Sequence, residues 1–263
     1  MAIKLLMFFS ESEPYDKGID LTNEKDGMIW QYKNYFDEII VYTPKILRDL
    51  GYNQSVKEYD NAGVVSVKNY KQNFIGFCAW KPLIIKLELL KSNNNDIIFY
   101  HDVNCTKYPQ YLLFKDIKNT INTLLEKCNY DFFIPQEDTR LVMWCKTNVI
   151  RELGNDHKFN YNFKQLCVNC MIFKNTNISL SLLDEWIECC NNETWLNGET
   201  YGSMHKDFIW HCPEQSILNN IIANWIKTRK YDIPIHFPFV YFNGRNINNI
   251  NNITDYNYLK FLG

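Results

Sequence analysis

The chain has 263 residues and a mass of 31.4 kDa, which suits one α/β domain or two small domains. It is 46% hydrophobic, 16% aromatic and 22% charged, so it can bury a large core and is not a disordered chain. Its 28 Lys and Arg nearly balance its 30 Asp and Glu, so no overall charge favours nucleic acid or acidic lipid. We therefore expect a folded, soluble protein without a nucleic-acid partner.

Cysteine usage and the apolar runs bear on the compartment. The nine cysteines lie mostly inside apolar segments, as reduced thiols do, so we expect a cytoplasmic protein. The first apolar run, Ile3 to Phe9, contains Lys4 and lacks a small-residue cleavage site after it, which indicates a strand rather than a signal peptide. No stretch reaches the roughly 18 to 20 apolar residues of a membrane span, so we expect no transmembrane segment.

Runs of strand length alternate with segments of helical periodicity along most of the chain. In chain order, we expect a strand at 3–9, a helix at 29–36, a strand at 38–42, a short helix from Pro44, an ambiguous segment at 54–74, a helix at 82–91, a strand at 97–100, a helix at 117–125, strands at 131–134 and 166–173, and helices at 182–187 and 213–225. The alternation predicts an α/β fold with a largely parallel central sheet and helices on both faces.

The run Ile97 to Tyr100 is apolar throughout, which is typical of a strand covered on both faces. No linker or internal repeat divides the chain, so we expect a single domain over residues 1–263. Sheets of this kind bind ligands beyond the carboxyl ends of their strands. Polar residues directly after a buried strand are therefore the first candidates for chemistry.

Asp102 and Asn104 follow the most apolar strand of the chain. Two oxygen ligands at this spacing suit a hard divalent cation, which would neutralise charge on a nucleoside-diphosphate leaving group. The alternative is an ordinary strand-end turn, in which Asp and Asn are common.

Three further segments carry candidate side chains. Lys81 stands at the amino end of a predicted helix, where it could meet phosphate beside free backbone N–H groups, or could simply be solvated. Glu214 and Gln215 stand in the first turn of a late helix, where Glu214 could act as a base or the pair could bind sugar hydroxyls. The structural alternative is that Glu214 only stabilises the helix, because the helix dipole favours an acid in the first turn. Glu137 and Asp138 follow the strand at 131–134 and are either a second acidic pair at the active edge or a solvated loop.

Other motifs argue against other classes of protein. Cys167 and Cys170 have the spacing of zinc ligands, but no second such pair and no matched His pair follows them. The chain contains no H-E-x-x-H, G-x-S-x-G, Walker or dinucleotide-binding glycine pattern, which disfavours hydrolases, NTPases and dehydrogenases.

The ordered set of segments resembles the GT-A type of nucleotide-sugar glycosyltransferases found in bacterial capsule synthesis and in large DNA viruses. The resemblance covers about residues 76–225. It rests on Trp80-Lys81-Pro82, Asp96 to Asp102, Gln165 to Phe173 with Lys174-Asn175, Asp184-Glu185-Trp186 and Glu214 to Leu218.

The resemblance implies a Rossmann-like GT-A domain that transfers a hexosyl or deoxyhexosyl group from a nucleotide sugar to an acceptor hydroxyl on a glycan or protein. We expect the donor to be a UDP-sugar and the transfer to be assisted by Mn²⁺ or Mg²⁺. The expected roles are as follows: Asp102, Asn104 and His236 hold the metal; Phe9, Ser10, Trp80, Lys81, Asp102 and Gln215 bind the donor; and Glu214 or Asp138 is the catalytic carboxylate.

Two positions depart from the family pattern. Asn104 stands where many relatives have a second Asp, and Asn169 stands where relatives commonly have Gly. These departures motivate a second hypothesis, a catalytically silent sugar- or nucleotide-binding protein on the same scaffold. A nucleotidyltransferase ranks last, because the chain lacks a glycine-rich triphosphate loop near the first strand.

Overall fold

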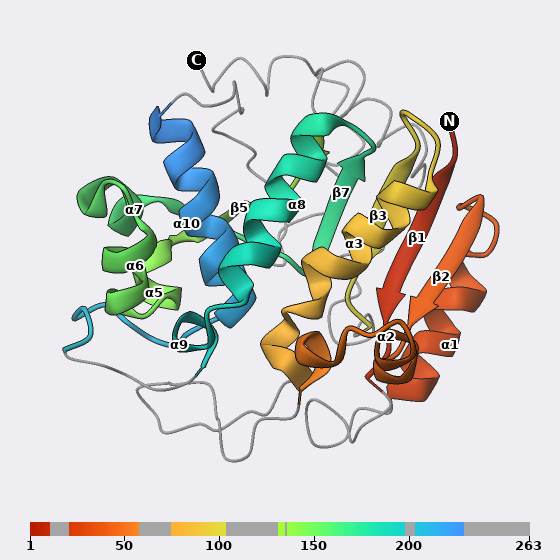
Figure 1. Ribbon diagram of the computed structural model, residues 1–263, viewed down its shortest axis with the longest axis horizontal. Helices are drawn as coiled ribbons and strands as arrows, with labels where there is room; N and C mark the ends of the chain where they lie inside the picture. The colour runs from red at the N-terminus through yellow and green to blue at the C-terminus, as the bar shows by residue number, and fades with distance from the viewer. Residues whose placement is uncertain (11–20, 58–74, 104–130, 135, 198–202, 229–263) are drawn as a thin grey trace.

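A mixed α/β architecture is seen in the computed structural model, which describes residues 1–10, 21–57, 75–103, 131–134, 136–197 and 203–228 (Figure 1). A five-stranded central sheet has the order β2-β1-β3-β7-β4, and β5 and β6 form a separate pair. The strands are β1 (Ile3–Phe8), β2 (Glu38–Tyr42), β3 (Ile97–His101), β4 (Phe132–Phe133), β5 (Gln136–Arg140), β6 (Lys164–Leu166) and β7 (Cys170–Lys174).

The α-helices are α1 (Leu21–Tyr32), α2 (Pro44–Asp49), α3 (Trp80–Lys91), α5 (Leu141–Trp144), α6 (Thr147–Leu153), α7 (His157–Asn162), α8 (Asn177–Cys190), α9 (Glu193–Leu196) and α10 (Pro213–Thr228). Two short 3₁₀ helices, η1 (Asn53–Val56) and η2 (Ile75–Cys78), lie before α3. Thr43 caps α2 by accepting a hydrogen bond from the Ile46 amide, and Pro44 occupies the first turn, as the sequence predicts.

Four of the five strands in the central sheet share one direction. β1 is parallel to β2 and to β3, whereas β7 is antiparallel to both β3 and β4. The predicted mostly parallel sheet is therefore confirmed, with β7 as the strand that departs from it. The carboxyl ends of β1, β2 and β3 lie at one edge, because Phe8 pairs with Tyr42 and Leu6 pairs with Tyr100.

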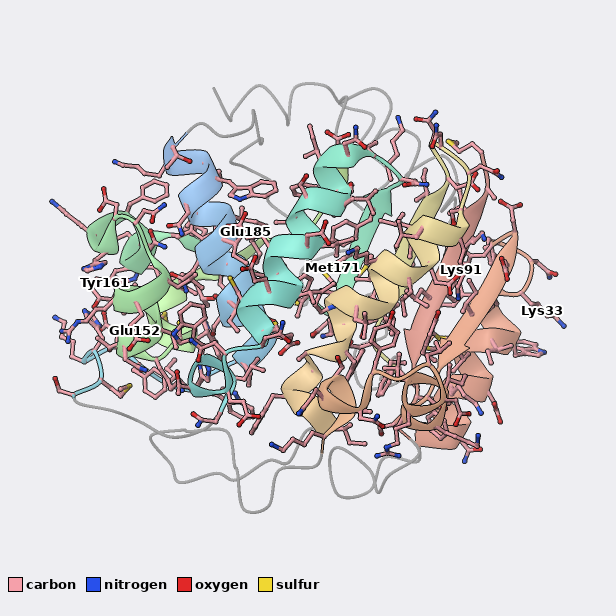
Figure 2. All side chains as sticks on the ribbon, viewed as in Figure 1. Lys33, Lys91, Glu152, Tyr161, Met171 and Glu185 are labelled. Atoms are coloured by element: carbon pink, nitrogen blue, oxygen red, sulfur yellow. The ribbon has the colours of Figure 1, made fainter. Side chains whose placement is uncertain are left out.

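Helices cover both faces of the sheet, as predicted, and each face has its own apolar core. Leu5 and Phe99 point toward α1, whose Met28 and Tyr32 are buried against them. Leu6 and Met171 point the other way, toward α3 and α8, which lie side by side over β3 and β7 (Figures 1 and 2). Because alternate residues enter opposite cores, β1, β3 and β7 are apolar along most of their length.

The strand predicted over 166–173 is wrong as a single element. The chain leaves β6 after Leu166 and enters β7 only at Cys170. Asn219 of α10 takes the place of a strand neighbour: its side-chain oxygen accepts from the Leu166 amide at 2.6 Å and its nitrogen donates to the Leu166 carbonyl at 3.1 Å. Because that side chain occupies the backbone groups of Leu166, β6 stays outside the central sheet.

Two other boundaries differ from the sequence prediction. The helix expected at 29–36 is α1, which ends at Tyr32; Phe36 lies beyond it but still packs on Phe99, with ring centres 5.4 Å apart. Glu137 and Asp138, for which a solvated loop was one of two alternatives, lie on strand β5. The predicted helix at 117–125 lies outside the described residues.

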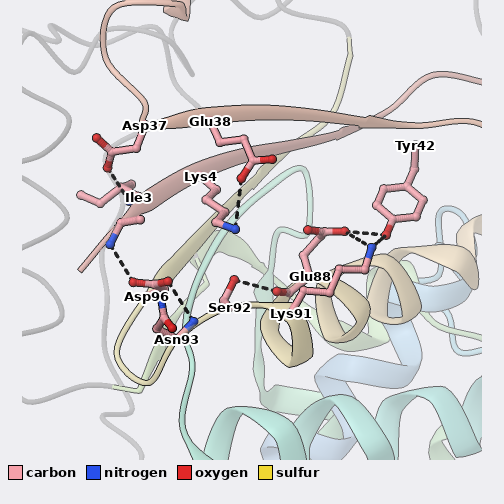
Figure 3. A network of polar contacts seen from close by, with 11 residues as sticks. Ile3, Lys4, Asp37, Glu38, Tyr42, Glu88, Lys91, Ser92, Asn93 and Asp96 are labelled. Atoms are coloured by element: carbon pink, nitrogen blue, oxygen red, sulfur yellow. Dashed lines mark hydrogen bonds and ion pairs between the residues drawn. The ribbon is translucent and has the colours of Figure 1, made fainter.

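Carboxylates hold the amino ends of the strands at the edge opposite the carboxyl ends (Figure 3). Asp96 accepts hydrogen bonds from the backbone amides of Ala2 at 2.7 Å and Asn93 at 2.9 Å, and Asp37 accepts from the Ile3 amide at 2.8 Å. These contacts join the start of β1 to the turns before β3 and β2. They fix how the three strands align, and therefore where their carboxyl ends lie.

A buried histidine fixes the segment that leads into α10. His211 is fully buried, accepts from the Lys146 amide through Nδ1 at 3.4 Å and donates from Nε2 to the Trp195 carbonyl at 2.8 Å. Burial, and then the charge of Lys146, lower the pKa of His211 to about 3.

We predict that acid destabilises the protein through His211. Its folded pKa lies below the unfolded value of about 6.5, so the unfolded state binds more protons between pH 6.5 and 3. The free energy of unfolding should therefore fall on acidification through this window, by about 1.4 kcal/mol per pH unit from this group. Urea titrations between pH 7 and 5 measure the slope. His211→Gln keeps a donor and does not titrate, so its slope should be flatter; equal slopes would contradict the assignment.

Candidate active site

Three segments that are distant in the sequence converge on Lys81. Lys81 lies in the first turn of α3 and is only 2% exposed. Its Nζ is 2.9 Å from Oε1 of Glu214, in the first turn of α10, and 3.3 Å from Oδ1 of Asp102, directly after β3. The structure thus brings together three of the residues that the sequence singled out, at the carboxyl edge of the sheet.

The two carboxylates keep Lys81 charged. Burial alone disfavours the ammonium and lowers the pKa of Lys81, but the negative charges of Asp102 and Glu214 outweigh burial and raise that pKa well above its ordinary value. The solvated lysine considered as an alternative is therefore wrong. With Lys81 charged and both carboxylates ionised, the three side chains carry a net charge of −1.

Asp102 is held by a partner that the sequence analysis missed. The Tyr100 hydroxyl donates to Oδ1 of Asp102, and the Asp102 amide donates to the Asn169 carbonyl at 2.8 Å. Burial, followed by the charge of Asp102, raises the pKa of Tyr100 well above its usual range, so the hydroxyl stays protonated as a donor. Residues two apart on a strand share a face, so the spacing of Tyr100 and Asp102 is the sequence signal that could have predicted this contact.

Asp102 faces the surface, whereas its neighbour His101 does not. The Asp102 side chain is 21% exposed, and its contacts with Lys81 and Tyr100 are both made by Oδ1. His101 is fully buried, burial lowers its pKa, and its Nδ1 donates to the Asp102 carbonyl at 2.6 Å. Of the two, Asp102 is therefore the residue that a ligand can reach.

Trp80 forms a wall of the site. Its ring stacks on Phe8 with centres 3.7 Å apart and planes 14° from parallel, and its Nε1 donates to the Ile75 carbonyl at 3.1 Å. Only 6% of Trp80 is exposed, so it shapes the site and leaves little ring surface for a donor. Phe9 and Ser10 are half-buried just beyond β1, and the Lys25 ammonium lies 4.7 Å from the Phe9 ring centre.

The backbone before Lys81 is held in an unusual conformation. Gly76, Phe77 and Cys78 have φ angles of 56°, 47° and 62°, all in the left-handed region. At Gly76 a Cβ would lie 2.0 Å from the Ser55 carbonyl oxygen, so no other residue fits there without displacing η1. Such strain persists only where surrounding contacts enforce it, and here it directs the chain into α3.

Gln215 contacts the protein's own backbone. Its Oε1 accepts from the Val168 amide at 3.5 Å, and it is 8% exposed. The Glu214 carbonyl accepts from Nε1 of Trp186 at 2.9 Å, which ties the first turn of α10 to α8. The structure therefore places Gln215 beside Glu214, as expected, but its amide supports the linker between β6 and β7.

The expected metal site is described only in part. Asn104 and His236 lie outside the described residues, as does the side chain of Asp138. Within the described ranges, no group of three His, Cys, Asp or Glu side chains is placed to hold a metal ion. Asp102 has the chemistry of a ligand for Mn²⁺ or Mg²⁺, being a partly exposed carboxylate, and would supply one oxygen.

The arrangement also suits an anion. Lys81 and Glu214 touch and each lies in the first turn of its helix, so the amino ends of α3 and α10 meet at this point. Helix amino ends attract negative charge through their unpaired N–H groups. The site therefore combines a fixed ammonium, two helix amino ends and two carboxylates.

No protein-family model, curated protein or solved structure matches this chain. The resemblance to GT-A glycosyltransferases therefore stays a hypothesis that rests on residues and their placement. In the part of the chain that the structure describes, no helix is both long and apolar enough to cross a membrane.

We predict that Lys81→Met destabilises the fold by about 3 kcal/mol at pH 7, because it leaves the buried Glu214 without its counter-charge. Urea denaturation at pH 7 measures it. Adding Glu214→Gln should restore much of the lost stability, and a double variant no more stable than Lys81→Met alone would contradict the pairing.

Proposed function

We propose that the chain is a glycosyltransferase of the GT-A type, which moves a sugar from a nucleotide-sugar donor, with UDP-sugars as the first candidates, to an acceptor hydroxyl on a glycan or protein. The observation that supports this most strongly is the convergence of Lys81, Asp102 and Glu214 at the carboxyl edge of a mostly parallel sheet. Such an edge is where open α/β sheets bind nucleotides.

The chemistry required is the stabilisation of a departing nucleoside diphosphate. Lys81 and the amino ends of α3 and α10 offer positive charge that is fixed before the substrate arrives. Because Lys81, Asp102 and Glu214 together carry −1, they cannot neutralise a diphosphate alone. A divalent cation bound at Asp102 would supply the missing positive charge and act as a Lewis acid.

Glu214 and Asp138 are the candidate bases for an acceptor hydroxyl. Glu214 is 6% exposed and bonded to Lys81, so an acceptor must approach within the site to reach it. Asp138 lies on β5, which pairs with β6 and so belongs to the same side of the molecule as the β6–β7 linker. A base is required if the configuration inverts and is not required if it is retained.

A catalytically silent binding protein is the second candidate. One observation favours it: Oε1 of Glu214 is 2.9 Å from the Lys81 ammonium. A binding protein can keep this ion pair, whereas a Glu214 that acts as a base must release Lys81 to accept a proton. The two functions differ in turnover, because both bind a nucleotide sugar and only the enzyme releases the nucleotide.

We predict that the protein releases UDP from at least one UDP-sugar in the presence of Mn²⁺ or Mg²⁺, and that chelation with EDTA reduces the rate at least tenfold. A coupled UDP-release assay over a panel of donors and acceptors measures this. Binding of UDP-sugars by calorimetry without UDP release would support the silent protein, and neither binding nor release would contradict both.

We predict that Asp102→Asn and Glu214→Gln each lower turnover about 100-fold, in line with the loss of a charged group that acts on the reacting atoms. Both changes keep the side-chain shape, so circular dichroism should show a folded protein. Asp49→Asn and Glu193→Gln, on exposed carboxylates, are matched controls and should keep wild-type rates. Full activity in a folded Asp102→Asn variant would remove Asp102 from the mechanism.

A further inference from the structure

Strand β2 forms one edge of the central sheet and lies at the side of the molecule (Figure 1). Among the described strands, it pairs with β1 alone. The Tyr42 carbonyl accepts from the Phe9 amide at 2.8 Å, so the backbone groups of Tyr42 and, two residues earlier, of Ile40 face β1. Those of Ile39 and Val41 therefore face outward, and no other described residue forms a backbone hydrogen bond with them.

An open sheet edge can pair with another strand, and proteins usually protect such edges with prolines, lysines or very short strands. The edge on the other side of the sheet is protected in this way, because β4 is only two residues long. β2 has five residues and contains neither Pro nor Lys, and its three central residues are apolar and half-buried: Ile39, Ile40 and Val41. Its outer edge can therefore accept a further strand.

The sequence of β2 is complementary to itself when two copies run antiparallel. Pairing Ile39 with Val41 of a second copy uses the outward backbone groups of both strands and puts a two-fold axis at Ile40. Ile40 then lies opposite Ile40 of the second copy, and Glu38 lies opposite Tyr42. In this register, the outward N–H and C=O groups of both strands are hydrogen-bonded.

The charges around β2 favour the same register. The Lys91 ammonium donates to the Tyr42 hydroxyl at 2.9 Å, and the Lys91 side chain is 58% exposed (Figure 3). The Glu38 side chain is 54% exposed and lies on the same face of the sheet as Tyr42, because the two residues are four apart on one strand. In the antiparallel pair, each Glu38 carboxylate therefore lies beside Tyr42 and the Lys91 ammonium of the other copy. The two-fold axis repeats this attraction, so a second copy of the chain supplies the matching charge twice.

Exposed apolar side chains lie beyond both ends of β2. Tyr35, in the turn before the strand, is 43% exposed, and Ile46 and Leu50, from the segment directly after it, are 39% and 52% exposed. Antiparallel pairing places the amino end of one strand beside the carboxyl end of the other. Tyr35 of one copy therefore lies at the same end of the paired strands as Ile46 and Leu50 of the other, where contact removes apolar surface from water.

We propose that the chain forms a two-fold symmetric dimer in which the outer edges of the two β2 strands pair antiparallel and join the two central sheets into one. The partner at this edge is a second copy of the chain, because the same strand supplies both the open backbone groups and the charge that complements Lys91. Two-fold dimers of this isologous kind are the commonest protein oligomers. The proposal does not depend on the proposed glycosyltransferase activity, since it uses none of the candidate active-site residues.

Analytical ultracentrifugation of the full chain, between micromolar and millimolar concentration, tests the proposal. The wild type should sediment as a dimer in this range. Val41→Pro removes an N–H donor that faces away from β1, so it should stay folded by circular dichroism and raise the dimer dissociation constant by about tenfold or more. Ile40→Pro is the matched control: it removes a donor to β1 and should lower the melting temperature.

Two further pairs of variants test the charges and the register. Glu38→Lys should weaken the dimer by about tenfold or more, because it faces Lys91 of the second copy, whereas Glu193→Lys, on exposed α9, should not. Ile40→Cys should cross-link two chains under mild oxidation, because facing Cα atoms in such a pair are about 4.5 Å apart. Glu38→Cys should not, because its two copies are separated by about 13 Å along the strands. Oxidised wild type gives the background from the native cysteines.

The remaining outcomes contradict the proposal. A wild-type chain that stays monomeric over the whole concentration range would overturn it. A dimer that persists in both folded Val41→Pro and Glu38→Lys, without cross-linking of Ile40→Cys, would overturn it as well, because its interface would lie elsewhere. If Val41→Pro does not fold, Glu38→Lys and Ile40→Cys decide. Each of these results leaves the proposed glycosyltransferase intact, since UDP release tests that function separately.

Discussion

The buried charge of Lys81 is the constraint on which the rest of the site depends. An ammonium that is 2% exposed requires compensating carboxylates, and Asp102 and Glu214 provide them from β3 and α10. The three elements must therefore meet at fixed distances. The left-handed turn at 76–78 and the stack of Trp80 on Phe8 direct α3 into that position, so local strain is stabilised by the contacts that Lys81 completes.

Helix α10 links this charge cluster to the second sheet. Its first turn carries Glu214, and its following turns carry amides that bind backbone groups of β6, of the end of α6 and of Asn155 just beyond it. Such side-chain to backbone bonds are directional, so they fix the β6–β7 linker more closely than apolar packing alone would. The polar face of α10 thus connects Glu214 to the end of β6 and to the β6–β7 linker.

The site is a negatively charged cluster around one positive charge, and this balance shapes its proposed chemistry. Lys81 and the helix amino ends favour an anion, but the three side chains together carry −1, so a diphosphate donor and a metal ion would bind together. Tyr100 stays neutral and orients Asp102 without adding charge. The dry walls formed by Trp80 and Phe8 strengthen each of these interactions, because charges act over longer range where water is excluded.

The sequence by itself determined the mixed α/β class, most strand positions and the three central candidates, because Lys81, Asp102 and Glu214 each mark the end of a helix or strand, which is a local property. Only the tertiary structure decided that Asp102 and Glu214 share Lys81, that Tyr100 orients Asp102 and that β7 is antiparallel. It also decided that Gln165 is buried without a hydrogen-bond partner among the described residues. These depend on contacts between segments far apart in the chain, which no periodicity or spacing encodes.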